Sequence, residues 1–362
     1  MKPVVAFGEI MGRIAMPGFR RFNQSLPGTV EFEFAGAEAN VLRSLADLGL
    51  PTRFITALPS SELGDACIAS LRSHGIDTGH IRRTSDGRLG LYFLEKGAAQ
   101  RAGVVLYDRD GSSIAITPDY PWATLLADAG WLHLTGITPA LSQAAADANL
   151  AAARTARSLG IPVSVDLNFR SKLWRWEPGT APRTLANRLL RELLPFATHC
   201  IAGREDAAEM LGIRPRTPPP SGDKPDLEAI LDVARQLHET FPNLEVIAIT
   251  LRQTLSASHH LWGGLLHHTG SLQTFHAPAT PDGAFDPYSI AHIVDRVGTG
   301  DAFSAGLIFA LNTPELAAPE IALRFATAAS CLAHSVEGDA NRCSRAEIES
   351  LLNGSGTFRV RR

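Results

Sequence analysis

The sequence predicts an α/β fold in which a mostly parallel sheet is covered by helices on both faces. Short apolar runs rich in β-branched residues alternate along the chain with longer segments rich in alanine and leucine, in which apolar residues recur at helical spacing. The chain has 362 residues, of which 45% are hydrophobic and 20% charged, so it is long and apolar enough to bury a large core. We expect one domain spanning residues 1–362.

The predicted elements follow one another in chain order. The expected strands are residues 4–10, 52–58, 131–137, 162–168, 198–203 and 245–251. The expected helices are residues 39–49, 63–75, 141–160, 226–241, 302–311 and 322–334. Two regions interrupt this alternation, because residues 16–36 and 88–118 have the pattern of hairpin strands without helices.

Two further segments have patterns of their own. Residues 261–266, Leu-Trp-Gly-Gly-Leu-Leu, predict a β-hairpin that turns at the two glycines. Residues 215–225 are rich in proline and predict a stiff polar loop.

Composition excludes several classes of function. A net charge of -3 gives no electrostatic footprint for nucleic acid, and no apolar run approaches the roughly 20 residues that cross a membrane. The first residues form a short strand-like run rather than a signal peptide, so we expect a cytoplasmic protein. The four cysteines form no C-x-x-C pair. The first strand lacks the G-x-G-x-x-G pattern of dinucleotide-binding oxidoreductases, and no Walker A pattern occurs.

The segment from Asp295 to Gly306 contains the residue pattern that is most informative about function. Its two glycines, Gly298 and Gly300, precede Asp301 and an apolar helical pattern, so an acid stands on the first turn of a helix. The backbone N–H groups of Gly298, Thr299 and Gly300 can hold a phosphate there, and Asp301 can accept the proton of an attacking hydroxyl. The alternative is a turn followed by an ordinary helix cap.

Three motifs resemble those of the ribokinase-like (pfkB-type) carbohydrate kinases. They are the loop Gly-Thr-Gly-Asp301 before a late helix, Gly8-Glu9 at the end of the first strand, and the block from Gly36 to Gly49 that contains Asn40. The resemblance implies a ribokinase-like doubly wound sheet with a small β-sheet lid, whose strands are inserted at about 16–36 and 88–118. In that family the lid closes over the sugar and often pairs with a second subunit, which implies a homodimer.

Four internal blocks resemble the 2-keto-3-deoxygluconate kinases within this family. They span residues 88–95, 105–113, 133–141 and 166–174. The resemblance implies ATP- and Mg²⁺-dependent phosphorylation of the 6-hydroxyl of 2-keto-3-deoxygluconate, with a requirement for a monovalent cation left open. The alternatives are a 2-keto-3-deoxygalactonate kinase, a fructokinase, or a non-catalytic sugar-acid sensor on the same scaffold.

The resemblance also assigns site residues. Those implied to hold the sugar acid are Gly36, Asn40, Tyr92, Tyr107, Arg109 and Arg170. Those implied around the nucleotide are Thr250, Arg252, Gly298, Gly300, Gly338, Asp339 and Asn341. The magnesium-positioning N-x-x-E motif of the family falls on Gly203-Arg-Glu-Asp206, which departs from the pattern and leaves Asp206 as the candidate metal residue. Arg13 replaces a substrate-binding aspartate of the ribose kinases, and it would suit an anionic substrate or be solvated.

Overall fold

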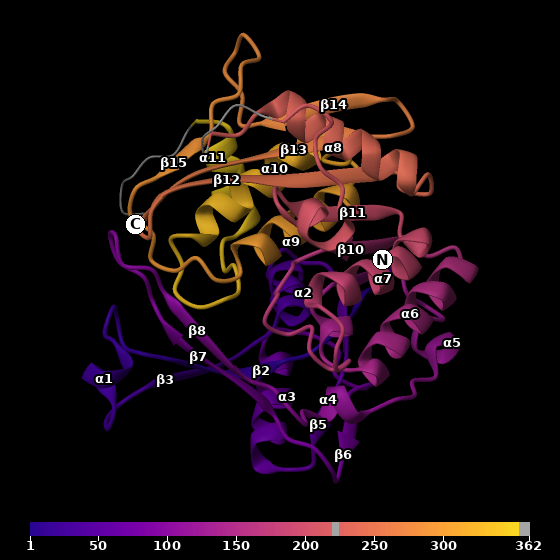
Figure 1. Ribbon diagram of the computed structural model, residues 1–362, viewed down its shortest axis with the longest axis vertical. Coiled ribbons are helices and arrows are strands. Elements are labelled where there is room, and N and C mark those ends of the chain that lie inside the picture. Colours follow the sequence, from indigo (N-terminus) through magenta and orange to yellow (C-terminus); the bar gives the residue numbers. More distant parts are fainter. Residues whose placement is uncertain (219–223, 355–362) are drawn as a thin grey trace.

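A computed structural model describes residues 1–218 and 224–354, and a nine-stranded mixed sheet forms the centre of this part of the chain (Figure 1). The strand order is β14-β13-β12-β11-β10-β9-β1-β4, and β15 also pairs with β13. The parallel strands are β1 (Val4–Phe7), β4 (Thr52–Ile55), β9 (Trp131–Thr135), β10 (Val163–Asp166), β11 (His199–Gly203) and β12 (Val246–Ser256). The antiparallel strands are β13 (His259–His268), β14 (Gln273–Ala277) and β15 (Tyr288–Ile290).

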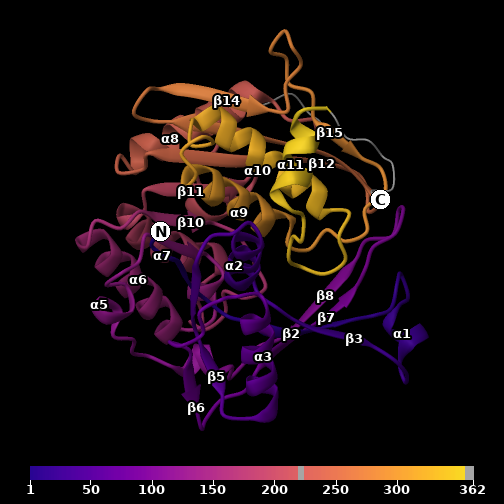
Figure 2. The same ribbon diagram turned by 180° about the vertical axis from the view of Figure 1, so that it is seen from behind.

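Helices cover both faces of this sheet, as Figures 1 and 2 show from opposite sides. One face packs against α5 (Trp122–Leu125), α6 (Gln143–Ser158), α7 (Pro182–Leu193) and α8 (Leu227–Thr240). The other packs against α2 (Ala37–Asp47), α3 (Glu62–Ser73), α9 (Thr299–Leu311), α10 (Pro319–Ala333) and α11 (Arg345–Leu352). Successive residues of β1 alternate between the two cores, with Val5 in the first and Val4 in the second. The predicted α/β fold, with helices on both faces of the sheet, is therefore confirmed.

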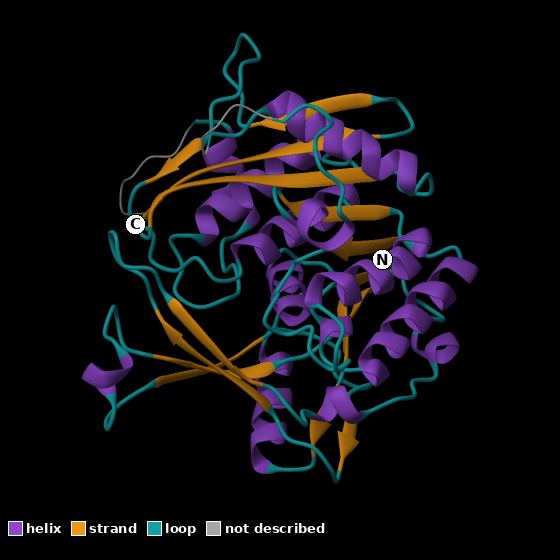
Figure 3. Ribbon diagram, viewed as in Figure 1, coloured by secondary structure: helices purple, strands orange, loops and turns teal. Residues whose placement is uncertain are grey.

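A smaller four-stranded sheet projects from the body (Figure 3). Its order is β3 (Glu31–Ala35), β2 (Met11–Ala15), β7 (Gly90–Glu95) and β8 (Val104–Asp108), and we call it the lid sheet. Its first strand begins at Met11, earlier than the predicted start at about residue 16, because β1 ends at Phe7 and the chain enters the lid sheet almost at once. The two lid regions also contain the one-turn helices α1 (Phe22–Ser25) and α4 (Ser113–Ile116), which the sequence did not predict. A separate pair of short strands, β5 (Ala57–Pro59) and β6 (Arg82–Thr84), lies beside α3 and α4.

The predicted Gly-Gly hairpin at residues 261–266 is wrong. These residues lie in the middle of β13, which pairs with β12 along its length, and the turn between the two strands is at residues 257–258. The glycines allow close packing instead, because a Cβ on Gly263 would lie 2.5 Å from the Phe285 ring and one on Gly264 would lie 3.0 Å from Leu323 Cδ1. A Gly-Gly pair therefore marks close packing here rather than a turn.

Other expectations concern the remaining segments. Part of the predicted loop at 215–225, residues 219–223, lies outside the described residues. All four cysteines are free. Within residues 1–218 and 224–354, no helix combines the length and apolar character needed to cross a bilayer.

Candidate active site

The candidate site lies at the carboxyl ends of the parallel strands, where ligands bind in open α/β sheets. Asp166 is the last residue of β10, Glu9 follows β1, and Asp206 follows β11. Asp301, on the first turn of α9, lies close enough to Asp166 to affect its ionisation. The fold thus gathers three buried carboxylates and the half-buried Asp206, from distant parts of the chain, at one edge of the sheet.

Asp301 is held in position by contacts between two helix starts, those of α9 and α2. Its side chain is 7% exposed, and its Oδ2 accepts a hydrogen bond of 2.8 Å from Asn40 Nδ2. Asn40 Oδ1 in turn accepts a bond of 3.3 Å from the N–H of Gly36. Burial raises the pKa of Asp301 to about 6, although Asn40 and Arg170 act in the opposite direction. Asp301, Asn40 and Gly36, all predicted as site residues, therefore lie together.

The two glycines before Asp301 have different surroundings. Gly298 has a φ of 78°, and a Cβ there would lie 1.7 Å from the backbone oxygen of Asp339, so the fold itself requires glycine. At Gly300, apart from its chain neighbours and the backbone of its own helix, no heavy atom of the described residues lies within 4 Å of the position that a Cβ would take. The first N–H groups of α9, including those of Thr299 and Gly300, have no intrahelical partner, so this open side can receive an anion.

Two buried acids were missed by the sequence analysis. Glu38, on the first turn of α2, accepts hydrogen bonds from Thr135 Oγ1 at 2.7 Å and Thr138 Oγ1 at 2.8 Å, and burial raises its pKa to about 7. Asp166 accepts a bond of 3.2 Å from Ser304 Oγ. Burial, followed by the nearby charges of Asp206 and Asp301, raises the pKa of Asp166 well above its usual range. Both acids stand in segments quoted for the family resemblance, which was the available signal.

These carboxylates fit a magnesium ion. Mg²⁺ keeps several waters and is bound through one or two carboxylates together with substrate phosphates. Asp166 and Asp206 supply two such carboxylates, and a bound cation would offset the two causes that raise the pKa of Asp166, burial first and then the nearby charge of Asp206. Asp206 also accepts bonds from the N–H groups of Gly203 at 2.7 Å and Phe169 at 3.4 Å, which fix its orientation. No group of three or more metal-ligating side chains occurs among the residues described.

A second set of charges joins the lid sheet to the body. Arg13, on β2, is 3% exposed and contacts Glu33, Asp295 at 2.5 Å and Asp339 at 3.2 Å. Burial lowers the pKa of Arg13, but the carboxylates of Asp339 and Asp295 outweigh this and raise it. Tyr92, on β7, donates to Asp339. Arg13 is thus neither solvated nor free for an anionic substrate, because three carboxylates already neutralise it.

This set of charges reaches the loop before α9. Asp295 Oδ1 accepts hydrogen bonds from the backbone N–H groups of Arg296 at 2.8 Å and Val297 at 3.1 Å. Arg13 therefore contacts the residue that shapes the turn leading to Gly298. We call Arg13, Glu33, Asp295, Asp339 and Tyr92 the lid latch.

The predicted sugar-acid arginines differ in their surroundings. Arg109 is 7% exposed, its Nε donates to Glu9 Oε2 at 2.6 Å, and its guanidinium lies 5.6 Å from the centre of the Tyr107 ring. Arg170 lies in the segment after β10, is exposed, and lies within electrostatic range of Asp206 and Asp301. Arg170 is therefore the more available of the two cations for a ligand.

The predicted nucleotide residues fall into two places. Thr250 and Arg252 lie on β12, and Arg252 is close enough to Arg170 and Arg296 for mutual repulsion, so three cations converge beside the start of α9. Asp339 belongs to the lid latch instead, because its carboxylate is engaged by Arg13 and Tyr92.

The neighbours of Asp339 also have structural contacts. A Cβ on Gly338, whose φ is 95°, would lie 2.9 Å from Glu33 Oε2. Asn341 is 3% exposed, and its Oδ1 accepts a bond of 3.1 Å from the N–H of Cys343. The Asp339 carboxylate thus contacts residues of the lid sheet, and the Asn341 amide oxygen contacts its own loop.

Comparisons with known proteins show what this chain is similar to. A family pattern described as pfkB family carbohydrate kinase matches residues 1–252. The chain is 30% identical to a 2-dehydro-3-deoxygalactonokinase of Haloferax volcanii, over 97% of this chain and 96% of the relative. It is 26% identical to a 2-dehydro-3-deoxygluconokinase of Bacillus subtilis, over 84% and 81%. The crystal structure of 2-dehydro-3-deoxygluconokinase from Thermotoga maritima has 35% identity and a TM-score of 0.86, and the match covers 98% of this chain and 100% of that one.

Proposed function

Because the chain belongs to the pfkB family of carbohydrate kinases, we propose that it uses ATP to phosphorylate the 6-hydroxyl of 2-keto-3-deoxygluconate. The observation that carries the proposal is the buried carboxylate of Asp301, held by Asn40 beside the open N-terminus of α9. A base and an anion site within one helical turn are the two parts that phosphoryl transfer to an alcohol requires.

Asp301 accepts the proton of the attacking hydroxyl in this mechanism. Its pKa of about 6 leaves it ionised at neutral pH while making it a stronger base than an ordinary aspartate. The N–H groups of Gly298, Thr299 and Gly300 stabilise the charge on the transferring phosphoryl group. Asp166 and Asp206 would hold Mg²⁺, which would supply positive charge to the nucleotide phosphates.

Arg170 binds the carboxylate of the sugar acid. It is exposed, carries a permanent charge, and lies near Asp301, so a substrate held between the two residues presents its anion and its hydroxyl at opposite ends. We propose that Asn40, Gly36, Tyr92 and Tyr107 also contact the sugar acid, and that Arg109, whose guanidinium lies over the Tyr107 ring, supports this ring. We propose that Thr250 and Arg252, both on β12, contact the nucleotide, and the closeness of Arg252 to Arg296 and Arg170 supports a site for its phosphates.

The test compares substrates and one arginine variant. ADP release is measured with 2-keto-3-deoxygluconate, its galactonate epimer and fructose for the wild type, Arg170→Leu and the control Arg157→Leu, an exposed arginine on α6. We expect the wild type to prefer the acids over fructose by on the order of 10²-fold in kcat/KM, because fructose leaves the cation unpaired. Arg170→Leu should raise KM for the acids and narrow that preference, whereas Arg157→Leu should not. A wild type that prefers fructose contradicts the proposal.

The galactonate epimer is the second candidate substrate. The Haloferax volcanii relative, at 30% identity over 97% of this chain, is named for that activity. The ratio of kcat/KM for the two epimers decides between them, and equal values indicate a kinase that accepts both.

The lid sheet supports the further proposal of a homodimer. The pairing register places Ile14, Phe32, Phe93 and Leu106 in one row across its four strands, on the face opposite Arg13 and Tyr92. Phe32 is 45% exposed and Leu106 is 50% exposed, so this outer face is apolar and open. A second copy of the lid sheet covers it in the proposed dimer. Sedimentation of the wild type and Leu106→Glu tests this, since a monomer in both cases contradicts it.

A further inference from the structure

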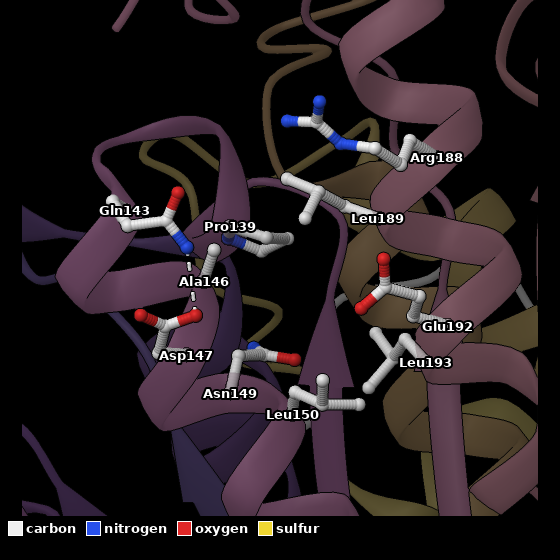
Figure 4. Close-up of a pocket in the computed structure, with 10 residues that line it drawn as sticks. All are labelled: Pro139, Gln143, Ala146, Asp147, Asn149, Leu150, Arg188, Leu189, Glu192 and Leu193. Atoms are coloured by element: carbon white, nitrogen blue, oxygen red, sulfur yellow. Dashed lines mark hydrogen bonds between the residues drawn. The ribbon is translucent and has the colours of Figure 1, made fainter. Parts of the chain in front are cut away.

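A cavity of about 200 Å³ lies between α6 and α7, outside the candidate active site (Figure 4). It is formed by the residues of the two helices that face each other and by Pro139, in the short helix η1 (Thr138–Ala140) that precedes α6. None of the residues assigned to the sugar acid, the nucleotide or the metal lines it.

The cavity contains a buried amide without a partner. Asn149, on α6, is 1% exposed, and neither its Oδ1 nor its Nδ2 has a hydrogen-bond partner among the residues described. Figure 4 shows this amide among the cavity residues, with its oxygen directed toward the α7 side. An unsatisfied buried amide is destabilising, so a group that bonds both of its polar atoms would be held strongly relative to its size.

The rest of the cavity is apolar inside and polar at its mouth. Pro139, Ala146 and Leu193 are buried beside Asn149, and Leu150 and Leu189 are half-buried. Exposed polar side chains surround the mouth, namely Gln143, Asp147, Arg188 and Glu192. A ligand that enters therefore places its flat polar edge against Asn149 and an apolar body against the leucines.

The charges at the mouth select against anions. Arg188 is already paired with Glu177, and Gln143 donates to Asp147 at 2.7 Å. The mouth thus carries two carboxylates, Asp147 and Glu192, and one cation, Arg188, whose charge Glu177 largely neutralises. Phosphorylated or acidic molecules, which include the substrates proposed above, are disfavoured here.

We propose that this cavity binds a small uncharged molecule that presents a carboxamide or the amide edge of a nucleobase. Asn149 offers one acceptor and two donors, and an amide edge presents a donor and an acceptor side by side in the matching arrangement. A cavity of about 150 Å³ accommodates benzene, so a volume of about 200 Å³ suits a ring that carries one amide group. The proposal does not depend on the kinase assignment.

The cavity is also connected to the segment that carries Arg170. Trp176 Nε1 donates to the backbone oxygen of Pro139 at 3.1 Å, and Glu177 pairs with Arg188, so two residues of this segment are anchored to cavity residues. A bound ligand should therefore slow amide hydrogen exchange in residues 170–181. Unchanged exchange at saturation would overturn this connection.

The experiment measures binding of benzamide, benzoate and toluene to the full-length protein by calorimetry and ligand-observed NMR. For a ligand of this size we expect a Kd of about 1 mM for benzamide, with binding at least about tenfold weaker for benzoate and for toluene. Asn149→Leu should weaken benzamide binding at least about tenfold. The control Asn187→Leu, on α7 but outside the cavity lining, should leave binding unchanged.

Stability provides an independent readout. Because Asn149 lacks protein partners, Asn149→Leu should keep the wild-type Tm or raise it. A variant that melts several degrees lower, or that fails to fold, would show that the amide is needed internally and would overturn the proposal. Absence of saturable benzamide binding to the wild type up to about 20 mM, or equal binding to benzoate, would overturn it without any variant. Ala146→Met, which fills the cavity, should abolish benzamide binding, and full retention would place the ligand elsewhere.

Discussion

Replacing Asp301 by asparagine tests the proposed base with little change in shape. The amide oxygen can still accept the hydrogen bond from Asn40 Nδ2, so the side chain should stay in place. The variant removes a negative charge that raises the pKa of both Glu38 and Asp166. We therefore expect Asp301→Asn to fold with an unchanged or higher Tm and to lose a factor of about 10²–10⁴ in kcat.

The pH dependence of kcat/KM provides a second test of Asp301 as the base. With a pKa of about 6, Asp301 is about half ionised at pH 6. Below that value, kcat/KM should fall about tenfold for each pH unit, because only the carboxylate accepts the proton. Above about pH 7, this group should cause no further increase. An ordinary aspartate would place the same inflection about two units lower.

The assay is coupled ADP release between pH 5 and 9, for the wild type, Asp301→Asn and Glu38→Gln. Glu38 is the matched control, because it is buried nearby and has a raised pKa but accepts bonds from two threonine hydroxyl groups. The acidic inflection should disappear in Asp301→Asn and persist in Glu38→Gln. ATP binding is measured separately by calorimetry, and it should be largely retained in both variants.

Three outcomes would refute this reasoning. One is retention of more than about a tenth of wild-type kcat in Asp301→Asn. Another is an inflection that persists in Asp301→Asn and is lost in Glu38→Gln, which would identify Glu38 as the base. The third is a fall in Tm of Asp301→Asn large enough to explain the lost activity by unfolding.

Three other predictions concern the surroundings of the site. Gly300→Val should keep a Tm near that of the wild type but lose a factor of at least about 10² in kcat. Gly298→Ala should instead lower the free energy of unfolding by about 1–3 kcal/mol. Equal Tm values for the two variants would contradict this difference between the glycines. Arg13→Met should lower the free energy of unfolding in urea by about 3–5 kcal/mol, because Asp339 loses its buried cation, and a loss below about 1 kcal/mol would contradict the latch. Burial raises the pKa of Glu38 and of Asp339 to about 7, so the folded protein retains protons that the unfolded chain has released; the free energy of unfolding should therefore fall from pH 5 to pH 8, and less so in Glu38→Gln.

The sequence predicted the strands and helices whose apolar pattern is set by burial. The helices expected at 141–160 and 226–241 are α6 and α8, with ends shifted by one or two residues. The helix α7 (Pro182–Leu193) was not predicted, although its signal was present in the sequence, since Leu185, Leu189 and Leu193 recur at helical spacing after Pro182.

The arrangement of the candidate site was predictable where its residues are neighbours in the chain. Gly298 to Asp301 lie within one helical turn, as their spacing indicated, and the anion site that we assign to them stays a prediction. The lid latch was not predictable, because Arg13 and Asp295 are 282 positions apart and meet only after the whole sheet has formed. The expectation for Arg13 was wrong for the same reason. We expected this arginine to face solvent or an anionic substrate, but three carboxylates of the protein pair with it.

The lid latch has a thermodynamic consequence for the two substrates. Arg13 belongs to the lid sheet, which we propose covers the sugar, while its partner Asp295 shapes the turn before Gly298, where we propose that backbone donors bind the phosphate. If a sugar stabilises one position of the lid sheet, it should therefore change the affinity for the nucleotide. The nucleotide should change the affinity for the sugar by the same factor. The two ligands should bind cooperatively, with equal factors in either order of addition, although they touch different elements of the fold.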